Sequence, residues 1–141
     1  MIVIGIDPDS VAHGVAIYRG GKLAELARMN LVELVKMLAE IKDPVVMQIE
    51  NVCANNFVYS RNNQASKAAQ AKVGLSIGRC QQSQIELQRF LDAAQVPYVL
   101  HKPQKGNWAK DKPTFEKLTG WQGRSNEETR SAAFFGFLGV K

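Results

Sequence analysis

Residues 1–18, MIVIGIDPDSVAHGVAIY, hold two apolar runs separated by a short polar turn. The run from Ile2 to Ile6 has the composition of a buried strand, and the carboxylate of Asp7 follows it directly. Pro, Asp and Ser then form a turn that leads into a second apolar run, His13 to Tyr18. An acid at the abrupt end of a buried strand is more typical of a functional site than of a solvated corner.

The spacing of apolar and turn residues predicts the elements that follow. Gly20-Gly21 indicates a hairpin into a third strand over 22–28. Helical spacing over 30–41 predicts a helix, with Asn30 as its cap and Glu33 three residues later. Further on, the pattern predicts a strand at 45–49, one long helix or two in series over 64–95, a strand at 97–101 and a helix at 125–138. This order predicts an α/β fold with a five-stranded mixed sheet flanked by helices.

Length and composition predict one globular domain over residues 1–141. The chain is 45% hydrophobic and 22% charged, and it is long enough to bury a core without disulfides. It has no apolar run of about 18 residues and no signal-peptide pattern at its start, so we expect a cytoplasmic protein, either nucleoid-associated or in a phage-infected cell. Cys53 and Cys80 are far apart in sequence and predict neither a disulfide framework nor a thiolate metal site.

A second acid repeats the pattern of the first, because Glu50 directly follows the strand predicted at 45–49. If the chain makes a right-handed return, the two strands are parallel neighbours, and Asp7 and Glu50 project from one edge of the sheet. Two carboxylates held close together repel each other unless a cation neutralises them. Oxygen ligands favour Mg²⁺ or Mn²⁺, so the sequence predicts a divalent metal site at this edge.

The last predicted helix offers a third polar contribution. Glu128 and Ser131 lie three residues apart, on the same face as the apolar Phe135 and Leu138. If that face packs on the sheet, the polar pair lies near the strand ends. The alternative is purely structural: Ser125 and Glu128 match an S-x-x-E capping box, which alone explains an acid at this position.

The chain is basic, with a formal net charge of +5. Residues 102–117, KPQKGNWAKDKPTFEK, hold five lysines and two acids, with Trp108 and Phe115 interleaved. Such a stretch attracts polyanions and gains affinity from counterion release. The alternative is a lysine-rich surface loop that only keeps the protein soluble.

Several stretches resemble the RuvC-like Holliday junction resolvases of the ribonuclease H-like superfamily. The resemblance is carried by IVIGIDPDSVAHGVAIY (2–18), VMQIENV (46–52) and NEETRSAAFFGFLG (126–139). It extends to NNFVYSRNNQASKAAQAKVGLSIGRC (55–80) and VLHKPQKGNWAKDK (99–112), which are similar to the family's loop with its long helix and to its basic stretch. The matching stretches cover nearly the whole chain in the family's order.

The resemblance implies an endonuclease that binds a four-way DNA junction as a homodimer and cuts two opposed strands by Mg²⁺-dependent hydrolysis, with two cations per site. It implies that Asp7 and Glu50 are the first two catalytic acids. Glu128 matches the third, with Glu127 as the adjacent alternative. Ser131 stands where the family has its final acid, so we expect cleavage to be weakened or lost. The alternative function is an inactive protein on the same fold that binds branched DNA.

Two glycines on the long predicted helix fit the implied homodimer. Gly74 and Gly78 are four residues apart and share a face, which lets another backbone approach at a helix-propensity cost of about 1 kcal/mol each. Two-fold symmetry would place two active sites on opposed strands of a junction.

Residues outside the acids are expected to contact DNA. The resemblance implies that Phe57 stacks on unpaired bases at the junction, whereas the alternative is an aromatic folded back onto the core. Candidate contacts with phosphates are Arg61, Lys67, Lys72, Lys102, Lys105, Lys110 and Lys112. For each basic residue taken alone, a solvated surface position is the alternative.

A third function belongs to a different class. GIDPDS (5–10), followed by a glycine in the next strand, also resembles the first phosphate loop of the actin and sugar-kinase ATPases. Those enzymes need a second, similar lobe to close over the nucleotide, and 141 residues do not supply one. A nucleotide-binding domain is therefore the weaker alternative.

Overall fold

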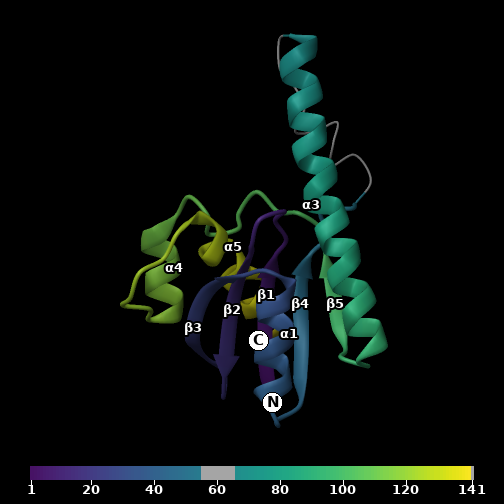
Figure 1. Cartoon of the computed structure of the whole chain (residues 1–141). Coiled ribbons are helices and arrows are strands. Elements are labelled where there is room, and N and C mark those ends of the chain that lie inside the picture. Colours follow the sequence, from purple (N-terminus) through teal and green to yellow (C-terminus); the bar gives the residue numbers. More distant parts are fainter. Residues whose placement is uncertain (55–65, 141) are drawn as a thin grey trace.

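The structure is a computed structural model of the chain, and it describes residues 1–54 and 66–140. The strands are β1 (Ile2–Asp7), β2 (His13–Arg19), β3 (Lys22–Met29), β4 (Val45–Glu50) and β5 (Tyr98–His101). The helices in this part of the chain are α1 (Leu31–Glu40), α3 (Lys67–Ala93), α4 (Lys112–Thr119) and α5 (Glu127–Val140). The strands form one sheet in the order β3-β2-β1-β4-β5 (Figure 1).

The predicted five-stranded mixed sheet is confirmed. β1 pairs antiparallel with β2 and parallel with β4, and β4 pairs parallel with β5. The return through α1 therefore brings β4 beside β1, as the sequence predicts. Because Ile6 pairs with Ile49, the strands end at the same edge of the sheet, with Asp7 and Glu50 next to each other.

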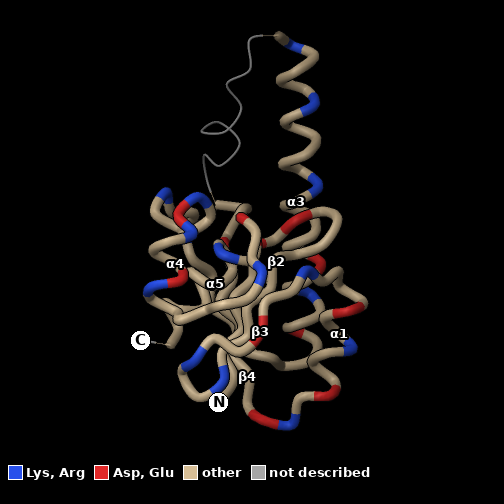
Figure 2. The backbone as a smooth tube through the Cα atoms, turned by 90° about the vertical axis from the view of Figure 1, so that its left-hand side faces the viewer, with Lys and Arg blue, Asp and Glu red and all other residues tan. Residues whose placement is uncertain are grey.

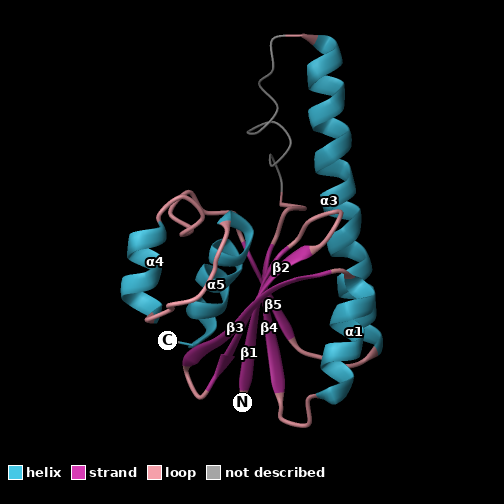
Figure 3. Cartoon of the chain, turned by 60° about the vertical axis from the view of Figure 1, so that its left-hand side comes forward, coloured by secondary structure: helices cyan, strands magenta, loops and turns pink. Residues whose placement is uncertain are grey.

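Helices cover both faces of the sheet, α1 and α3 on one face and α4 and α5 on the other (Figure 3). Successive side chains of a strand point to opposite faces, so β1 supplies both cores. Ile2, Ile4 and Ile6 belong to the core under α1 and α3, whereas Val3 belongs to the core under α5. Asp7 has the parity of Val3 and therefore points to the α5 face.

The last helix lies close against the middle of the sheet. A Cβ atom added to Gly14 of β2 would lie 2.8 Å from the carbonyl carbon of Glu128, and one added to Gly136 of α5 would lie 2.8 Å from the ring of Tyr18. The Tyr18 hydroxyl also donates a hydrogen bond to the Ala133 carbonyl at 2.6 Å. Glycines in the strands and in the helix thus place the first turn of α5 directly over the strand ends.

One helix was not predicted, because the lysine-rich stretch reads as a loop from its composition. α4 forms its second half. Asp111 caps the helix by accepting hydrogen bonds from the Thr114 amide (3.2 Å) and hydroxyl (2.7 Å), and Pro113 lies in the first turn. Gly120 ends it with a left-handed φ of 74°. The capping residues at both ends therefore stabilise a helix in a stretch whose charge pattern suggests a loop.

The capping box predicted for the last helix is wrong. α5 begins at Glu127, and the hydrogen bonds of Asn126 cap it. The Asn126 Oδ1 atom accepts from the Thr129 amide at 2.8 Å, and the Thr129 Oγ1 atom accepts from the Asn126 amide at 2.9 Å. Glu128 takes no part in this cap, so capping does not explain the acid at this position.

The long helix predicted over 64–95 is a single helix, α3, whose first half extends beyond the sheet (Figures 1 and 2). Its buried side chains lie in the second half, apart from Ile77. A Cβ atom added to Gly78 would meet nothing within 4 Å in the described part of the chain, so no partner for this glycine is seen there. None of the helices described is long and apolar enough to cross a membrane.

Candidate active site

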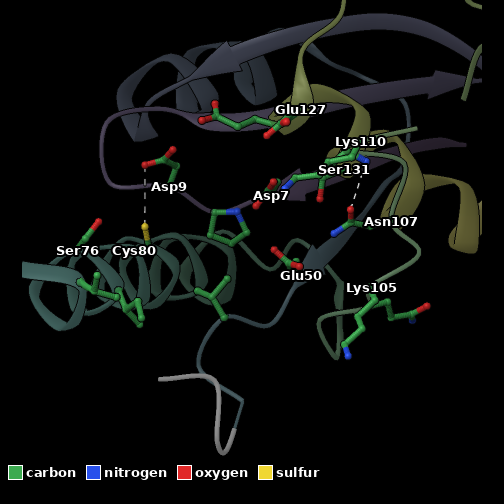
Figure 4. A pocket seen from close by; sticks show the side chains of 17 residues that line it. Asp7, Asp9, Glu50, Ser76, Cys80, Lys105, Asn107, Lys110, Glu127 and Ser131 are labelled. Atoms are coloured by element: carbon green, nitrogen blue, oxygen red, sulfur yellow. Dashed lines mark hydrogen bonds between the residues drawn. The ribbon is translucent and has the colours of Figure 1, made fainter. Parts of the chain in front are cut away.

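Asp7 and Glu50 form a carboxylate pair on the α5 face of the sheet (Figure 4). Glu50 is only 6% exposed. Burial, the negative charge of Glu50 and a hydrogen bond between the two carboxyl groups together raise the pKa of Asp7 to about 8. The cation-free pair therefore holds a proton at neutral pH, since two adjacent buried carboxylates do not both ionise.

Ser131 of α5 is 2% exposed and lies beside this pair. The nearby Ser131 side chain lowers the pKa of the Asp7 carboxyl, against the larger effects of burial and Glu50. Its buried Oγ atom makes no hydrogen bond within the described residues. The hydroxyl can thus stabilise a charged Asp7. It does not bring the negative charge that the resemblance leads one to expect at this position.

Glu128 lies on the same helix, three residues before Ser131, but its carboxylate is engaged elsewhere. Its Oε2 atom is 2.7 Å from Nε of Arg28 on β3. Burial and a hydrogen bond with Asp9 raise the pKa of Glu128, whereas the Arg28 guanidinium lowers it. Glu128 therefore contacts Arg28 and Asp9 rather than the Asp7–Glu50 pair.

Sequence reasoning missed Asp9, in the turn after β1. Its amide donates to His13 Nδ1 at 3.1 Å, and the thiol of Cys80 on α3 lies 4.0 Å from its Oδ1 atom. These contacts join the turn to β2 and to α3. The spacing Asp7-Pro-Asp9 was a usable signal, because it places a second acid within one turn of the first.

These acids line one pocket of about 710 Å³ between α3, α5 and the lysine-rich stretch (Figure 4). Its apolar lining includes Val73 and Ile77 of α3. Its charged lining comprises five acids and two lysines: Asp7, Asp9, Glu50, Glu127, Glu128, Lys105 and Lys110. All four predicted acids therefore line this pocket.

The two lysines reach the pocket because their stretch is anchored on α5. Arg130 donates from Nη2 and Nε to the carbonyl oxygen of Ala109, at 2.8 and 3.2 Å. Trp108 is 5% exposed and packs against Phe134 with ring centroids 5.4 Å apart. The backbone between Lys105 and Lys110 is thereby attached to the helix that carries Ser131.

Four other predicted basic contacts do not line the pocket. Lys102 and Lys112 are exposed at either end of the loop segment, outside the pocket lining. Lys67 and Lys72 are exposed on the projecting first half of α3 (Figure 2). Residues 67–85 of this helix contain no Asp or Glu. Phe57 and Arg61 lie outside the described residues.

The backbone that follows Glu50 is held by glutamines of α3. The Val52 amide donates to Gln84 Oε1 at 2.8 Å, and Gln81 Nε2 donates to the Val52 carbonyl at 3.1 Å. Gln84 Nε2 also donates to Asn51 Oδ1 at 2.9 Å. Gln84 is fully buried. A glutamine within the apolar stripe of the helix was the sequence signal for this support.

The donor chemistry of the pair fits an oxygen-ligated divalent cation. Two carboxylates converge, and a divalent cation would neutralise their mutual repulsion in place of the shared proton. Both ligands are oxygens, and neither sulfur nor imidazole belongs to the pair. In residues 1–54 and 66–140, no three His, Cys, Asp or Glu side chains are grouped closely enough to hold a metal ion. The full ligand set of Asp7, Glu50 and a helix acid therefore stays a prediction.

No protein-family model matches the chain, and no curated protein matches it. Two solved structures from Thermus thermophilus do. RuvC in complex with a Holliday junction substrate aligns over 97% of this chain and 90% of its own, with a TM-score of 0.53 and 14% identity. A second RuvC structure aligns over 97% of this chain and 92% of its own, with a TM-score of 0.53 and 16% identity.

This chain has the RuvC fold. The resemblance seen in the sequence is confirmed at this level, and so is the predicted fold class. At 14–16% identity the likeness concerns the fold, so the function rests on the site itself.

Proposed function

We propose that residues 1–141 form a RuvC-type endonuclease domain that cuts branched DNA, four-way junctions above all, with divalent cations. The observation that carries this proposal is the buried Asp7–Glu50 pair on adjacent parallel strand ends. This is the edge at which open α/β sheets bind their ligands. The fold, shared with a RuvC structure that holds a Holliday junction substrate, supports the choice of DNA.

The pair would hold Mg²⁺ or Mn²⁺, with Glu127 or Glu128 as a further ligand, and we propose two cations per site. When bound, the cations would neutralise the charge that develops on the phosphoryl group and on the oxygens that enter and leave. The residues themselves would release the proton shared by Asp7 and Glu50, and the Ser131 side chain beside Asp7 favours the charged form of that carboxyl. Burial of the pair limits competition from bulk water.

Basic residues would hold the DNA around this pocket. Lys105 and Lys110 line the pocket and would contact the phosphates that flank the scissile bond. Lys67 and Lys72 on the projecting part of α3 would contact a more distant arm of the branched substrate. We propose a homodimer, because two opposed strands require two sites related by a two-fold axis.

Cleavage and binding of a labelled four-way junction test the proposal. Asp7→Asn and Glu50→Gln should abolish nicking in Mg²⁺ and Mn²⁺ while gel-shift binding persists, because each variant removes a metal ligand and no DNA contact. Asp43→Asn, an exposed acid after α1, is the matched control and should cut normally. Equal cleavage by the wild type and both pair variants would contradict the proposal.

A second candidate function is recognition of branched DNA without cleavage. Two observations favour it: Ser131 replaces an expected carboxylate, and Glu128 is paired with Arg28. Both reduce the negative charge available to cations. Tight junction binding with no nicking in either metal would identify this function.

A further inference from the structure

Three residues on neighbouring strands form one row across the sheet. Asp7 of β1 pairs with Gly14 of β2, and Gly14 pairs with Arg28 of β3. Directly paired residues point to the same face of a sheet. This row points towards α5, because a Cβ atom added to Gly14 would lie 3.3 Å from the Cβ of Glu128.

Glu128 therefore lies above Gly14, with Arg28 on one side and Asp7 on the other. Its carboxylate is turned to the Arg28 side, where the ion pair measures 2.7 Å. Asp9 also lies near this carboxylate and raises its pKa. On the other side, Glu128 makes only the smallest of the contributions that raise the pKa of Asp7.

The Glu128 side chain has room to exchange sides. Both members of the ion pair are partly exposed, with 43% of the Arg28 side chain and 35% of the Glu128 side chain accessible. Because Gly14 has no side chain, the space directly above it is taken by the backbone and Cβ of Glu128 itself. Rotation about the side-chain torsions of Glu128 suffices, because its Cβ already lies over the centre of the row.

We propose that Arg28 is a positioning residue that competes with the divalent cation for Glu128. This inference rests on the proposed function, since it assumes a cation at the Asp7–Glu50 pair. In the cation-free protein, Arg28 holds the carboxylate of Glu128 on the β3 side of Gly14. A cation at the pair draws the carboxylate across Gly14, and Arg28 gives it up.

Binding of Mn²⁺ in the absence of DNA, followed by the paramagnetic resonance signal of the free ion, measures this competition directly. Arg28→Gln should tighten Mn²⁺ binding about fivefold, the size expected for the loss of one partly exposed ion pair. Arg28→Lys restores a cation beside Glu128 and should bind Mn²⁺ within about twofold of the wild type. Arg19→Gln is the matched control, because Arg19 pairs with Glu25 at 3.5 Å on the same strand pair, and it should change nothing.

A double-mutant cycle separates competition for Glu128 from the general effect of removing a positive charge. In a Glu128→Gln background, Arg28→Gln should change Mn²⁺ affinity by less than about twofold, because the contested carboxylate is gone. A gain of similar size in both backgrounds would overturn the proposal, since it would then come from the overall field.

Two further outcomes separate failure of this inference from failure of the proposed function. If the wild type binds Mn²⁺ through Asp7, as shown by loss of binding in Asp7→Asn, but Arg28→Gln binds equally tightly or more weakly, the competition is refuted and the proposed function stands. If no variant binds Mn²⁺ and Asp7→Asn makes no difference, the metal site and this inference both fail.

Discussion

Gly5 of β1 lies so close to α5 that a Cβ atom there would overlap the carbonyl oxygen of Ala132 and come within 2.6 Å of the Gly136 amide nitrogen. Both neighbours are backbone atoms, which cannot rotate away. The helix that carries Glu128 and Ser131 thus reaches the strand ends only because residue 5 has no side chain. The close approach at Gly5 therefore sets where Glu128 and Ser131 lie at the site.

We therefore expect Gly5→Ala to lower the free energy of unfolding by about 1–3 kcal/mol, because the helix must move off the sheet. Urea denaturation measures this loss. Gly78→Ala is the matched control: a Cβ atom there meets nothing within 4 Å, and alanine favours the helix, so this variant should be about 0.5–1 kcal/mol more stable. Loss of stability in both variants would contradict the assignment of the effect to the helix contact.

The raised pKa of Asp7 predicts how stability depends on pH in the absence of metal. The folded value of about 8 exceeds the ordinary 3.8, so between these values the folded protein binds more protons than the unfolded chain. The free energy of unfolding should then fall as pH rises from about 4 to 8, by at most about 1.4 kcal/mol per pH unit from this group.

Thermal unfolding from pH 5 to 8.5, with chelator or with Mn²⁺, checks this expectation. Mn²⁺ replaces the shared proton, so its stabilising effect should grow with pH. Asp7→Asn should flatten the chelator profile relative to the wild type, and it should remove the response to Mn²⁺. A wild-type profile unchanged by the Asp7 substitution would show that this carboxyl keeps an ordinary pKa.

Local sequence signals predicted the parts of the fold that depend on neighbouring residues. The apolar runs that end in Asp7 and Glu50 form β1 and β4, and the capping box of Asn30 and Glu33 is present at α1. α4 was missed because its lysine-rich stretch was interpreted as a loop and the cap at Asp111 was not considered. For this helix the capping residues predict the structure better than the lysine content does, because a cap bonds to the backbone whatever charges lie nearby.

Long-range contacts explain the rest of what the sequence did not predict. Arg28 and Glu128 are 100 positions apart, and only the pairing of β3 with β2 and the packing of α5 bring them together. No local pattern indicates such an ion pair. Gln84 gave a weak signal, as a polar residue in an apolar stripe, but its partner at Val52 follows only from the tertiary structure.

Ser131 leads to a gain-of-function prediction. Ser131→Asp places a carboxylate beside the pair, so we expect tighter Mn²⁺ binding and faster nicking of a four-way junction, by about tenfold for each 1.4 kcal/mol that the added ligand contributes. The same change should destabilise the cation-free protein, because a further buried acid joins a pair that already shares a proton. Nicking rates and chelator melting curves measure both effects. Ser131→Asn adds similar volume without charge, and it should not stimulate nicking.

The lysines at the pocket lead to a prediction about the salt dependence of DNA binding. Lys105 and Lys110 are held at the pocket by the anchoring of their stretch on α5, so each is expected to neutralise a phosphate. Each substitution to Gln should weaken junction binding and should lower the slope of log K against log salt by about 1. Lys36→Gln, on the exposed face of α1, is the charge-matched control and should leave the slope unchanged. If the Lys36 variant lowers the slope as much as the other two, binding follows overall charge, and the two pocket lysines have no special position on the DNA.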